Sequence, residues 1–234
     1  MAFDFVQGEV LLVDKPLEWT SFDVVNFIRS FLRKKYNLKK LKVGHAGTLD
    51  PLATGLLIIC TGKLTKQIDT FQGMDKVYVG QMKLGATTPS FDKETEEDHQ
   101  FDLDGISEND LVETAKKFLG EIDQVPPIYS AIKIDGKRAY EHARKKEHRE
   151  IKPRRVTINE FNLLNINLPL IDFYVKSSKG TYIRSLVRDF GKELNNGAYL
   201  TALRRTQIGS FTVNDAYTMD AFKEAVMKET DNYE

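Results

Sequence analysis

Residues 44–55 read Gly44-His45-Ala46-Gly47-Thr48-Leu49-Asp50-Pro51-Leu52-Ala53-Thr54-Gly55, and the apolar run Leu56-Leu57-Ile58-Ile59-Cys60 follows directly. Glycine allows backbone angles and close approaches that a side chain would block. Pro51 fixes its own φ and pushes Asp50 towards an extended conformation. The pattern predicts a stiff loop that presents one carboxylate at the mouth of a buried strand. Such loops often carry function, although Asp and Pro also form ordinary turns, which is the alternative interpretation.

Short apolar segments lie on both sides of this loop in the sequence. Their spacing predicts strands at residues 9–13, 56–60, 77–84, 156–168, 170–178 and 199–205. Capping residues and helical spacing predict helices at about residues 20–35, 107–119, 180–194 and 219–228. In the first helix we expect an inward face made of Phe22, Val25, Ile28 and Leu32. Helices and strands do not alternate strictly, which favours an α+β fold built on a mixed sheet.

The charges are balanced in number but segregated along the chain. Lys and Arg total 34 and Asp and Glu total 34. Residues 29–42 hold seven basic side chains and no acid, residues 133–155 hold ten basic and four acidic ones, and residues 92–110 hold nine acids and one lysine. Local patches matter more than the sum for a polyanionic partner. The alternative is two solvated basic faces and an acidic loop.

Several classes of protein are disfavoured by the composition. Cys60 is the only cysteine, so no disulfide forms within the chain, and a reducing, cytoplasmic location is expected. The four histidines show no zinc-ligand spacing, so no metal is expected. No apolar run approaches the ~20 residues that span a bilayer, and the N-terminus does not resemble a secretion signal. We expect a monomer without membrane contact.

The loop at 44–51 belongs to a set of segments that follow one another in a characteristic order. The others are Asp14-Lys15-Pro16, Lys76-Val77-Tyr78-Val79-Gly80, Lys83-Leu84-Gly85-Ala86-Thr87-Thr88 with Asp92, Gln124-Val125-Pro126-Pro127, Tyr129-Ser130-Ala131-Ile132-Lys133, Gly180-Thr181-Tyr182-Ile183-Arg184-Ser185-Leu186, and Leu203-Arg204-Arg205 before Gly209-Ser210-Phe211. In this order, over roughly residues 8–215, the chain resembles the bacterial tRNA pseudouridine synthase B family (TruB). The resemblance implies the pseudouridine synthase fold, a mainly antiparallel sheet flanked by helices. It also implies one catalytic domain over residues 1–234, with an RNA-binding thumb insertion at about 126–155.

The resemblance implies an enzyme that isomerises uridine to pseudouridine at position 55 in the T-loop of tRNA, with the T-arm as its partner. The reaction is redox-neutral and transfers no phosphate, so no cofactor is expected. Asp50 matches the catalytic aspartate of the family, Arg184 the arginine that pairs with it, and Tyr78 the tyrosine that stacks on the target base. The target base should be flipped out of its stack. The sequence leaves open whether the carboxylate attacks the base, attacks C1′ or drives a glycal route.

Further residues take binding roles by the same resemblance. His45 is expected near the flipped nucleotide, as a phosphate or stacking contact, and Tyr182 as a second aromatic of the site. Lys15 is expected to support the loop or contact the RNA backbone, and Leu203 to line the uracil pocket. In the thumb, the residues expected to bind RNA phosphates are Lys133, Arg144, Lys145, Lys146 and Arg154.

Two departures from the family pattern accompany the resemblance. Glu18 stands where the family usually has glycine, and the chain ends about twenty residues after Phe211, so no C-terminal PUA-type domain is expected. One alternative is a guide-RNA-dependent relative, which the short C-terminus disfavours. Another is a non-catalytic RNA-binding or tRNA-folding factor that uses the same surface. Asp50, Tyr78 and Arg184 together disfavour pure binding, because binding alone does not require that set.

Overall fold

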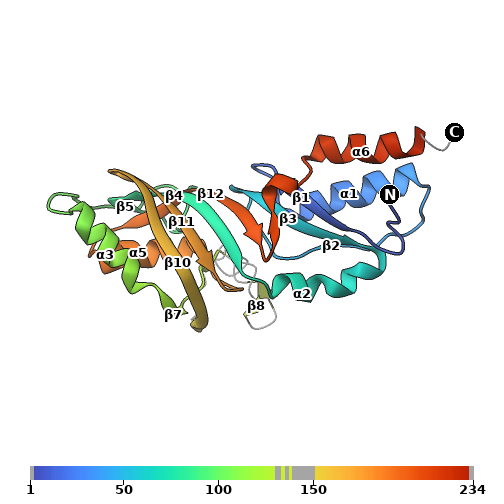
Figure 1. The fold of residues 1–234 in the computed structure, drawn as a ribbon. Coiled ribbons are helices and arrows are strands. Elements are labelled where there is room, and N and C mark those ends of the chain that lie inside the picture. Colours follow the sequence, from blue (N-terminus) through green and yellow to red (C-terminus); the bar gives the residue numbers. More distant parts are fainter. Residues whose placement is uncertain (1–2, 130–132, 135–136, 139–150, 232–234) are drawn as a thin grey trace. The chain divides into compact units, whose positions relative to one another are not determined.

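The computed structural model describes residues 3–129, 133–134, 137–138 and 151–231 (Figure 1). The chain gathers into two compact units, here called the first and the second unit. The first comprises Met1–Tyr78 with Arg204–Glu234, and the second comprises Val79–Leu203. The predicted division into one catalytic domain and a thumb stays a prediction.

The first unit is a small sheet with helices on both faces. Its strands follow the order β1–β3–β12, β2 pairs with β3, and β13 pairs with β12. Two strands, β4 and β12, contribute residues to both units. The elements with residues in this unit are β1 (Val10–Lys15), α1 (Ser21–Lys35), β2 (Val43–His45), β3 (Ala53–Thr61), the 3-10 helix η1 (Gly62–Gln67), α2 (Ile68–Gln72), β4 (Lys76–Leu84), β12 (Ala198–Ile208), β13 (Phe211–Thr212), η2 (Val213–Asp215) and α6 (Met219–Asp231).

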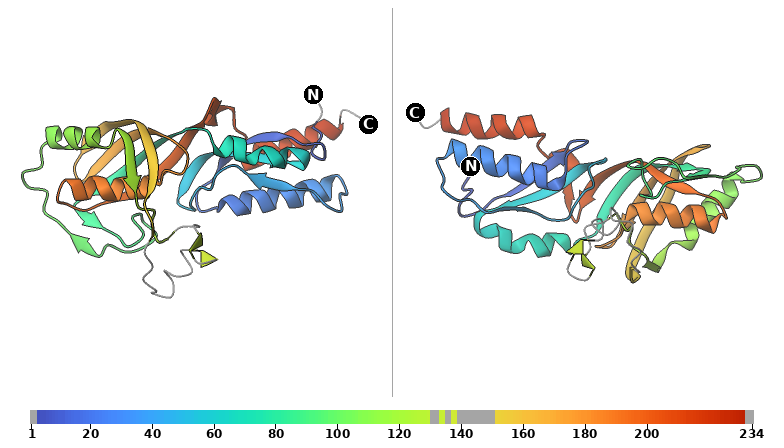
Figure 2. Two further views of the ribbon diagram at one scale, coloured as in Figure 1. Left: turned by 90° about the horizontal axis from the view of Figure 1, so that it is seen from below. Right: turned by 180° about the vertical axis from the view of Figure 1, so that it is seen from behind.

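Both faces of β3 are buried because helices cover each of them (Figures 1 and 2). Side chains point to opposite faces at successive strand positions. Leu57 and Ile59 therefore pack in one core with α1 and α6, while Ile58 and Cys60 pack in the other with Phe71 of α2. A strand buried on both faces reads as a continuous apolar run, and this explains the composition of residues 56–60.

The second unit packs helices against one face of a sheet of order β12–β4–β11–β10–β7, in which β10 is antiparallel to both β11 and β7. Phe161 of β10 packs edge-on against Phe173 of β11 and against Phe190 of α5. Gly80 of β4 leaves room for Phe173, since a Cβ there would lie 2.6 Å from the ring. The remaining elements are β5 (Ala86–Thr87), β6 (His99–Gln100), α3 (Glu108–Lys117), β7 (Gly120–Gln124), β8 (Lys133–Ile134), β9 (Lys137–Arg138), β10 (Arg154–Asn167), β11 (Leu170–Ser177) and α5 (Ile183–Glu193).

The structure confirms the α+β class and a mainly antiparallel sheet flanked by helices. Helix α1 begins after Thr20 in a complete capping box with Asp23, and α3 begins in the same way after Ser107. The inward face predicted for α1 is wrong at Phe22, whose side chain is 60% exposed, because Val24 occupies the core instead. Segment β7 and the elements at 62–72 were not predicted.

Candidate active site

The loop that carries Asp50 joins β2 to β3 in the first unit and is held at several backbone atoms. Ser21 at the start of α1 accepts a hydrogen bond from the Leu49 amide at 2.8 Å and donates one to the Leu49 carbonyl at 3.2 Å. The Glu18 amide donates to the Pro51 carbonyl at 2.9 Å. Asp50 is half-buried at the tip of this loop. The stiff loop predicted from the sequence is therefore held in place from α1 and the turn before it.

Lys15 lies buried beneath the same loop. Its ammonium donates to the carbonyls of Trp19 at 2.6 Å, Pro16 at 2.9 Å and Pro51 at 3.4 Å. Burial lowers the pKa of Lys15 to about 8, against the opposing effect of the Asp50 carboxylate. All three N–H groups thus have acceptors, which favours the loop-supporting role over an RNA contact. At neutral pH the loop holds one ammonium near the Asp50 charge.

Arg205 of β12 is a fully buried side chain that contacts three parts of the site. Its Nε donates to the Leu56 carbonyl at 2.8 Å and its Nη2 to the Gly47 carbonyl at 3.1 Å. Burial lowers the pKa of this guanidinium, while its hydrogen bond with the Tyr78 hydroxyl raises it. Arg205 therefore links the Asp50 loop, β3 and Tyr78. Arg205 stands in one of the segments that carry the family resemblance, but the resemblance assigned it no role.

The close approach of β3 to β12 explains one glycine of the opening stretch. Gly55 has φ +104°, a conformation that L side chains rarely adopt, and a Cβ there would run into the backbone carbonyl of Arg205. Glycine at this position thus lets the buried arginine reach the loop.

Tyr78 and His45 belong to the first unit, where Tyr78 is buried and His45 is half-buried. Tyr78 on β4 is 8% exposed, and its hydroxyl is directed to Arg205. His45 ends β2, and burial together with the Arg205 charge lowers its pKa, while a backbone hydrogen bond at Gly47 opposes this. Its Nδ1 is buried without a hydrogen-bond partner among the described residues. A neutral imidazole suits stacking or a neutral hydrogen bond better than an ion pair with phosphate.

Arg184 lies in the first turn of α5 in the second unit and is buried together with Asp92. Its Nη1 lies 3.3 Å from Asp92 and 3.2 Å from the Ser90 carbonyl, and its Nη2 donates to the Tyr129 carbonyl at 2.9 Å. These contacts fix the guanidinium in a buried position. Its predicted pairing with Asp50 stays a prediction. Asp92 was named in the matching segments but was not assigned as the partner of Arg184.

Two further predicted residues lie on the second unit. Tyr182 caps α5 and is half-buried, and its amide donates to the Gln124 side chain at 2.8 Å. Leu203 is half-buried on β12. Their contacts with a flipped base stay predictions.

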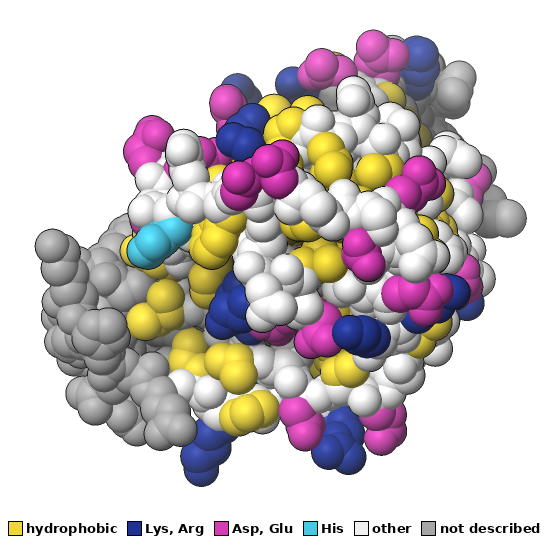
Figure 3. Space-filling view, turned by 90° about the vertical axis from the view of Figure 1, so that its left-hand side faces the viewer, with side chains coloured by type: hydrophobic (Ala, Val, Ile, Leu, Met, Phe, Trp, Pro, Cys, Tyr) yellow, Lys and Arg dark blue, Asp and Glu magenta, His cyan; other side chains and the backbone are white. Residues whose placement is uncertain are grey.

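The predicted phosphate-binding residues of the thumb fall largely outside the described residues. Arg144, Lys145 and Lys146 lie there entirely, and of Lys133 only the place in β8 is described. Arg154 is exposed at the start of β10, opposite Gln124 of β7. Figure 3 shows the end of the second unit with α3 and β5, where acidic, uncharged and hydrophobic side chains are interspersed and the visible Lys and Arg stand mostly apart.

Within residues 3–129, 133–134, 137–138 and 151–231, no group of three or more His, Cys, Asp or Glu side chains is placed to hold a metal ion. In the same part of the chain no helix has the length and apolar character that a membrane crossing requires.

Two family models match adjoining parts of the chain, which together cover residues 33–234. Residues 33–183 match the N-terminal domain of the TruB family pseudouridylate synthases, and residues 184–234 match the tRNA pseudouridylate synthase B C-terminal domain. The chain belongs to the TruB family. Among TruB relatives, tRNA pseudouridine synthase B of Flavobacterium johnsoniae is 57% identical over 224 residues, which cover 95% of this chain and 98% of that one. The protein of the same name from Phocaeicola vulgatus is 52% identical, with 94% of both chains covered.

Solved structures agree with the TruB assignment at the level of the fold. A chain of a Cbf5–Nop10–Gar1 complex superimposes with a TM-score of 0.74 at 28% identity, and a chain of an H/ACA RNP bound to a substrate RNA containing 2′-deoxyuridine with 0.71 at 26%. Each match covers 98% of this chain but 57% of the other, so this TruB chain spans little more than half the length of those chains. The pseudouridine synthase fold expected from the sequence is confirmed.

Proposed function

We propose that the protein isomerises uridine to pseudouridine at position 55 in the T-loop of tRNA, without a cofactor. Family membership and the names of relatives that share half or more of their residues with it support this activity and substrate. The buried cations Lys15 and Arg205 hold the loop that carries the Asp50 carboxylate, which fits this reaction. We propose further that it acts as a monomer in the cytoplasm, in line with its single buried cysteine.

The observation that carries the proposal is the Asp50 loop. Its backbone is bound by the buried side chains of Lys15 and Arg205, and both are positive groups that face carbonyls of the loop. A carboxylate on such a support is pre-organised for covalent or proton-transfer chemistry, because no reorganisation is needed when charge develops.

The reaction breaks the bond between N1 and C1′ and forms one between C5 and C1′. C5 then loses its proton, and N1 gains one, so atoms and electrons balance without an oxidant or a second substrate. Asp50 serves this sequence as a nucleophile on C1′ or on the base, or as the base that removes a sugar proton in a glycal route. All three routes need an ionised carboxylate, and the ammonium of Lys15 nearby favours that state.

Tyr78 and Arg184 complete the proposed site. We assign Tyr78 to stacking on the flipped base, with its hydroxyl fixed by Arg205. We assign Arg184 to pairing with Asp50 in addition to the Asp92 contact that orients it. A base held in this way must leave its stack, and unpaired loop nucleotides do so at least cost.

Asp50→Asn tests the proposal directly. The variant keeps the size of the side chain but removes the carboxylate, so pseudouridine formation in a tRNA transcript should fall below detection while tRNA affinity stays within a few-fold. Asp69→Asn is the matched control, because Asp69 is exposed on α2 of the same unit. Pseudouridine mapping at nucleotide resolution measures both the rate and the position. Turnover by Asp50→Asn near the wild-type rate, or modification at another position, would overturn the assignment.

A further inference from the structure

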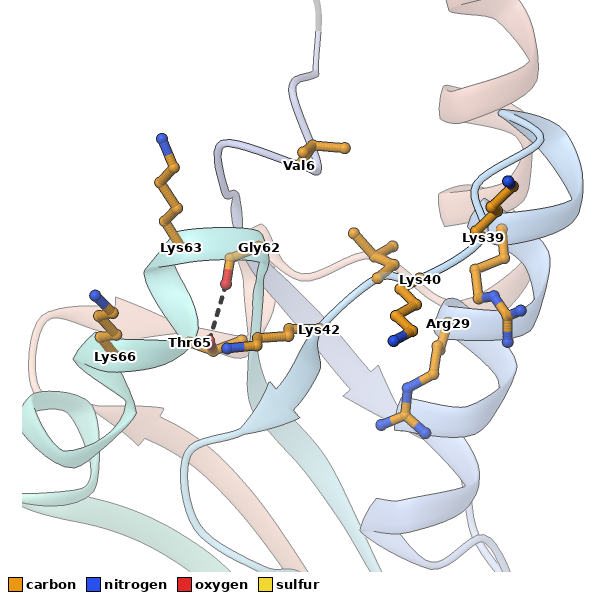
Figure 4. Close-up of a pocket in the computed structure, with 11 residues that line it drawn as sticks. Val6, Arg29, Lys39, Lys40, Lys42, Gly62, Lys63, Thr65 and Lys66 are labelled. Carbon is orange, nitrogen blue, oxygen red and sulfur yellow. Dashed lines mark hydrogen bonds between the residues drawn. The ribbon is translucent and has the colours of Figure 1, made fainter.

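A basic groove of about 660 Å³ lies on the first unit, outside the site described above (Figure 4). Its basic side chains come from three segments: Arg29 and Arg33 from α1, Lys39, Lys40 and Lys42 from the stretch before β2, and Lys63 and Lys66 from η1. Seven of its eleven lining residues are therefore Lys or Arg, and none of the eleven is acidic. We name these seven side chains and the space between them the basic groove.

Two of the cations in the basic groove, Arg29 and Lys63, are oriented by neutral partners. Arg29 donates to the Asn26 side chain at 2.9 Å and to the Val43 carbonyl at 3.0 Å. Lys63 donates to the side chain of Gln7 at 2.6 Å. Neutral acceptors fix a cation without cancelling its charge, so the groove keeps a positive potential that attracts anions.

The geometry fits an extended anion better than a compact one. In Figure 4, Lys63 and Lys66 stand on η1 at one side, and Arg29, Lys39 and Lys40 stand at the other, so the charges are spread along the groove. Lysines are flexible point charges that suit a phosphate backbone, whereas a small anion is usually held by a rigid fork of donors. The groove lining has no aromatic side chain on which a base could stack. Its chemistry is therefore that of backbone contact without base reading.

The distance from Asp50 follows from the strand pairing. Strand β3 runs antiparallel to β2, with Val43 opposite Thr61, and the Gly62 amide bonds the Lys42 carbonyl at 2.9 Å. The groove thus lies at the end of β3 away from the Asp50 loop. The nine residues of β3 span roughly 27 Å at the usual rise of ~3.4 Å per residue. An A-form RNA duplex rises about 2.8 Å per base pair, so this separation corresponds to about ten base pairs.

We propose that the basic groove binds the phosphodiester backbone of the helical part of the same tRNA, about ten base pairs from the target nucleotide. This inference rests on the function proposed above, since it takes the tRNA as the bound RNA. The groove adds affinity and orientation and takes no part in the chemistry. It provides a second RNA contact that the sequence had shown only as a run of basic residues at 29–42.

The test compares RNA hairpins that carry the same loop on stems of five and twelve base pairs. Lys40, Lys42 and Lys66 are changed together to Gln in the full chain, and binding is measured by fluorescence anisotropy from 50 to 300 mM salt in the Asp50→Asn background. The matched control changes three lysines outside the groove, Lys116, Lys223 and Lys228, which lie within 4 Å of carboxylates. Both triple variants alter the net charge equally.

With the long stem, the groove variant should lower the slope of log K against log salt by roughly 2 to 3, at ~0.7 to 0.9 for each phosphate contact. At 0.1 M salt this corresponds to a loss of up to ~8-fold for each contact. With the short stem, the variant and the parent should have the same slope. The control variant should leave the salt slope unchanged on both stems.

Three results would overturn the proposal. They are an unchanged slope on the long stem, an equal loss on both stems, and an equal loss in the control variant. The groove is a small-anion site instead if inorganic pyrophosphate raises the melting temperature of the parent but not of the groove variant, and the two proteins have the same salt slope for RNA binding. Pseudouridine formation in the Asp50-containing protein is measured separately, so failure of the catalytic proposal is distinguished from failure of this one.

Discussion

Replacing Arg205 by methionine removes the buried donors that hold the Asp50 loop, β3 and Tyr78 together. The carbonyls of Leu56 and Gly47 each lose a charged donor at about 3 Å. A buried acceptor left without its partner costs about 1–3 kcal/mol. The two together cost roughly 2–6 kcal/mol, and removal of a fully buried charge offsets part of this. We expect a net loss of about 3 kcal/mol in the free energy of unfolding, or ~6–12 °C in Tm for a chain of this size.

A double-mutant cycle separates a positioning role from a merely structural one. Tyr78→Phe removes only the hydroxyl that bonds Arg205. If Arg205 positions Tyr78 for the reaction, the losses of kcat/KM in Arg205→Met and Tyr78→Phe should be non-additive, with a coupling of about 0.5–3 kcal/mol. Rates are measured well below the lowest Tm, with Arg205→Lys as the variant that keeps the charge. Strictly additive losses of kcat/KM, or a Tm for Arg205→Met within 2 °C of the parent at about 2–4 °C per kcal/mol, would refute the reasoning.

Three further substitutions follow from the same loop. Lys15 has a pKa of about 8 in the folded protein against an ordinary 10.5. Between these pH values the folded state binds fewer protons than the unfolded state, so the free energy of unfolding rises with pH by up to ~3 kcal/mol. Urea unfolding of Lys15→Met from pH 7.5 to 10.5 should lack this rise, and a pH profile identical to that of the parent would contradict the prediction. Gly55→Ala should lower the free energy of unfolding by more than ~2 kcal/mol, because it adds both φ strain and the clash with β12. The control Gly105→Ala, at φ +83° with open space around it, should lower it only by the ~1 kcal/mol of φ strain. Equal losses of stability in the two variants would contradict the close approach of β3 to β12. Glu18 has φ +66°, so Glu18→Gly should raise the stability by up to ~1 kcal/mol with little change in kcat/KM, and a lowered Tm would speak against strain there.

The elements that the sequence predicted well are those with a strong local signal. Both capping boxes mark their helices within the sequence itself, and the apolar run of β3 reports burial on two faces. Strand β7 has no such signal, because its residues are mostly exposed at the edge beside β10. The error at Phe22 is one of helical phase: at 100° per residue, Phe22 lies about 100° from the centre of the stripe of Ser21, Val24, Val25, Ile28 and Leu32 that is buried.

The same contrast between local sequence signals and contacts made by the fold applies to the candidate site. The resemblance assigned the residues that we propose act on the substrate, because they lie in short contiguous motifs. It did not assign the residues that hold them, because that role depends on atoms brought together by the fold. Arg204 and Arg205 illustrate this: Arg204 pairs with Asp14 at 2.7 Å at a partly exposed position, while its neighbour is fully buried.

The alternation of β12 explains why two adjacent arginines differ so completely. Successive side chains of a strand point to opposite faces, so only one of the two faces the Asp50 loop. Which of them does so depends on the register between β12 and β3, and Gly55 permits that register by leaving out a side chain that would strike the Arg205 carbonyl. Gly55 and Arg205 therefore act together although they lie 150 residues apart in the sequence: the glycine permits the close approach of the two strands, and the arginine then reaches the Asp50 loop.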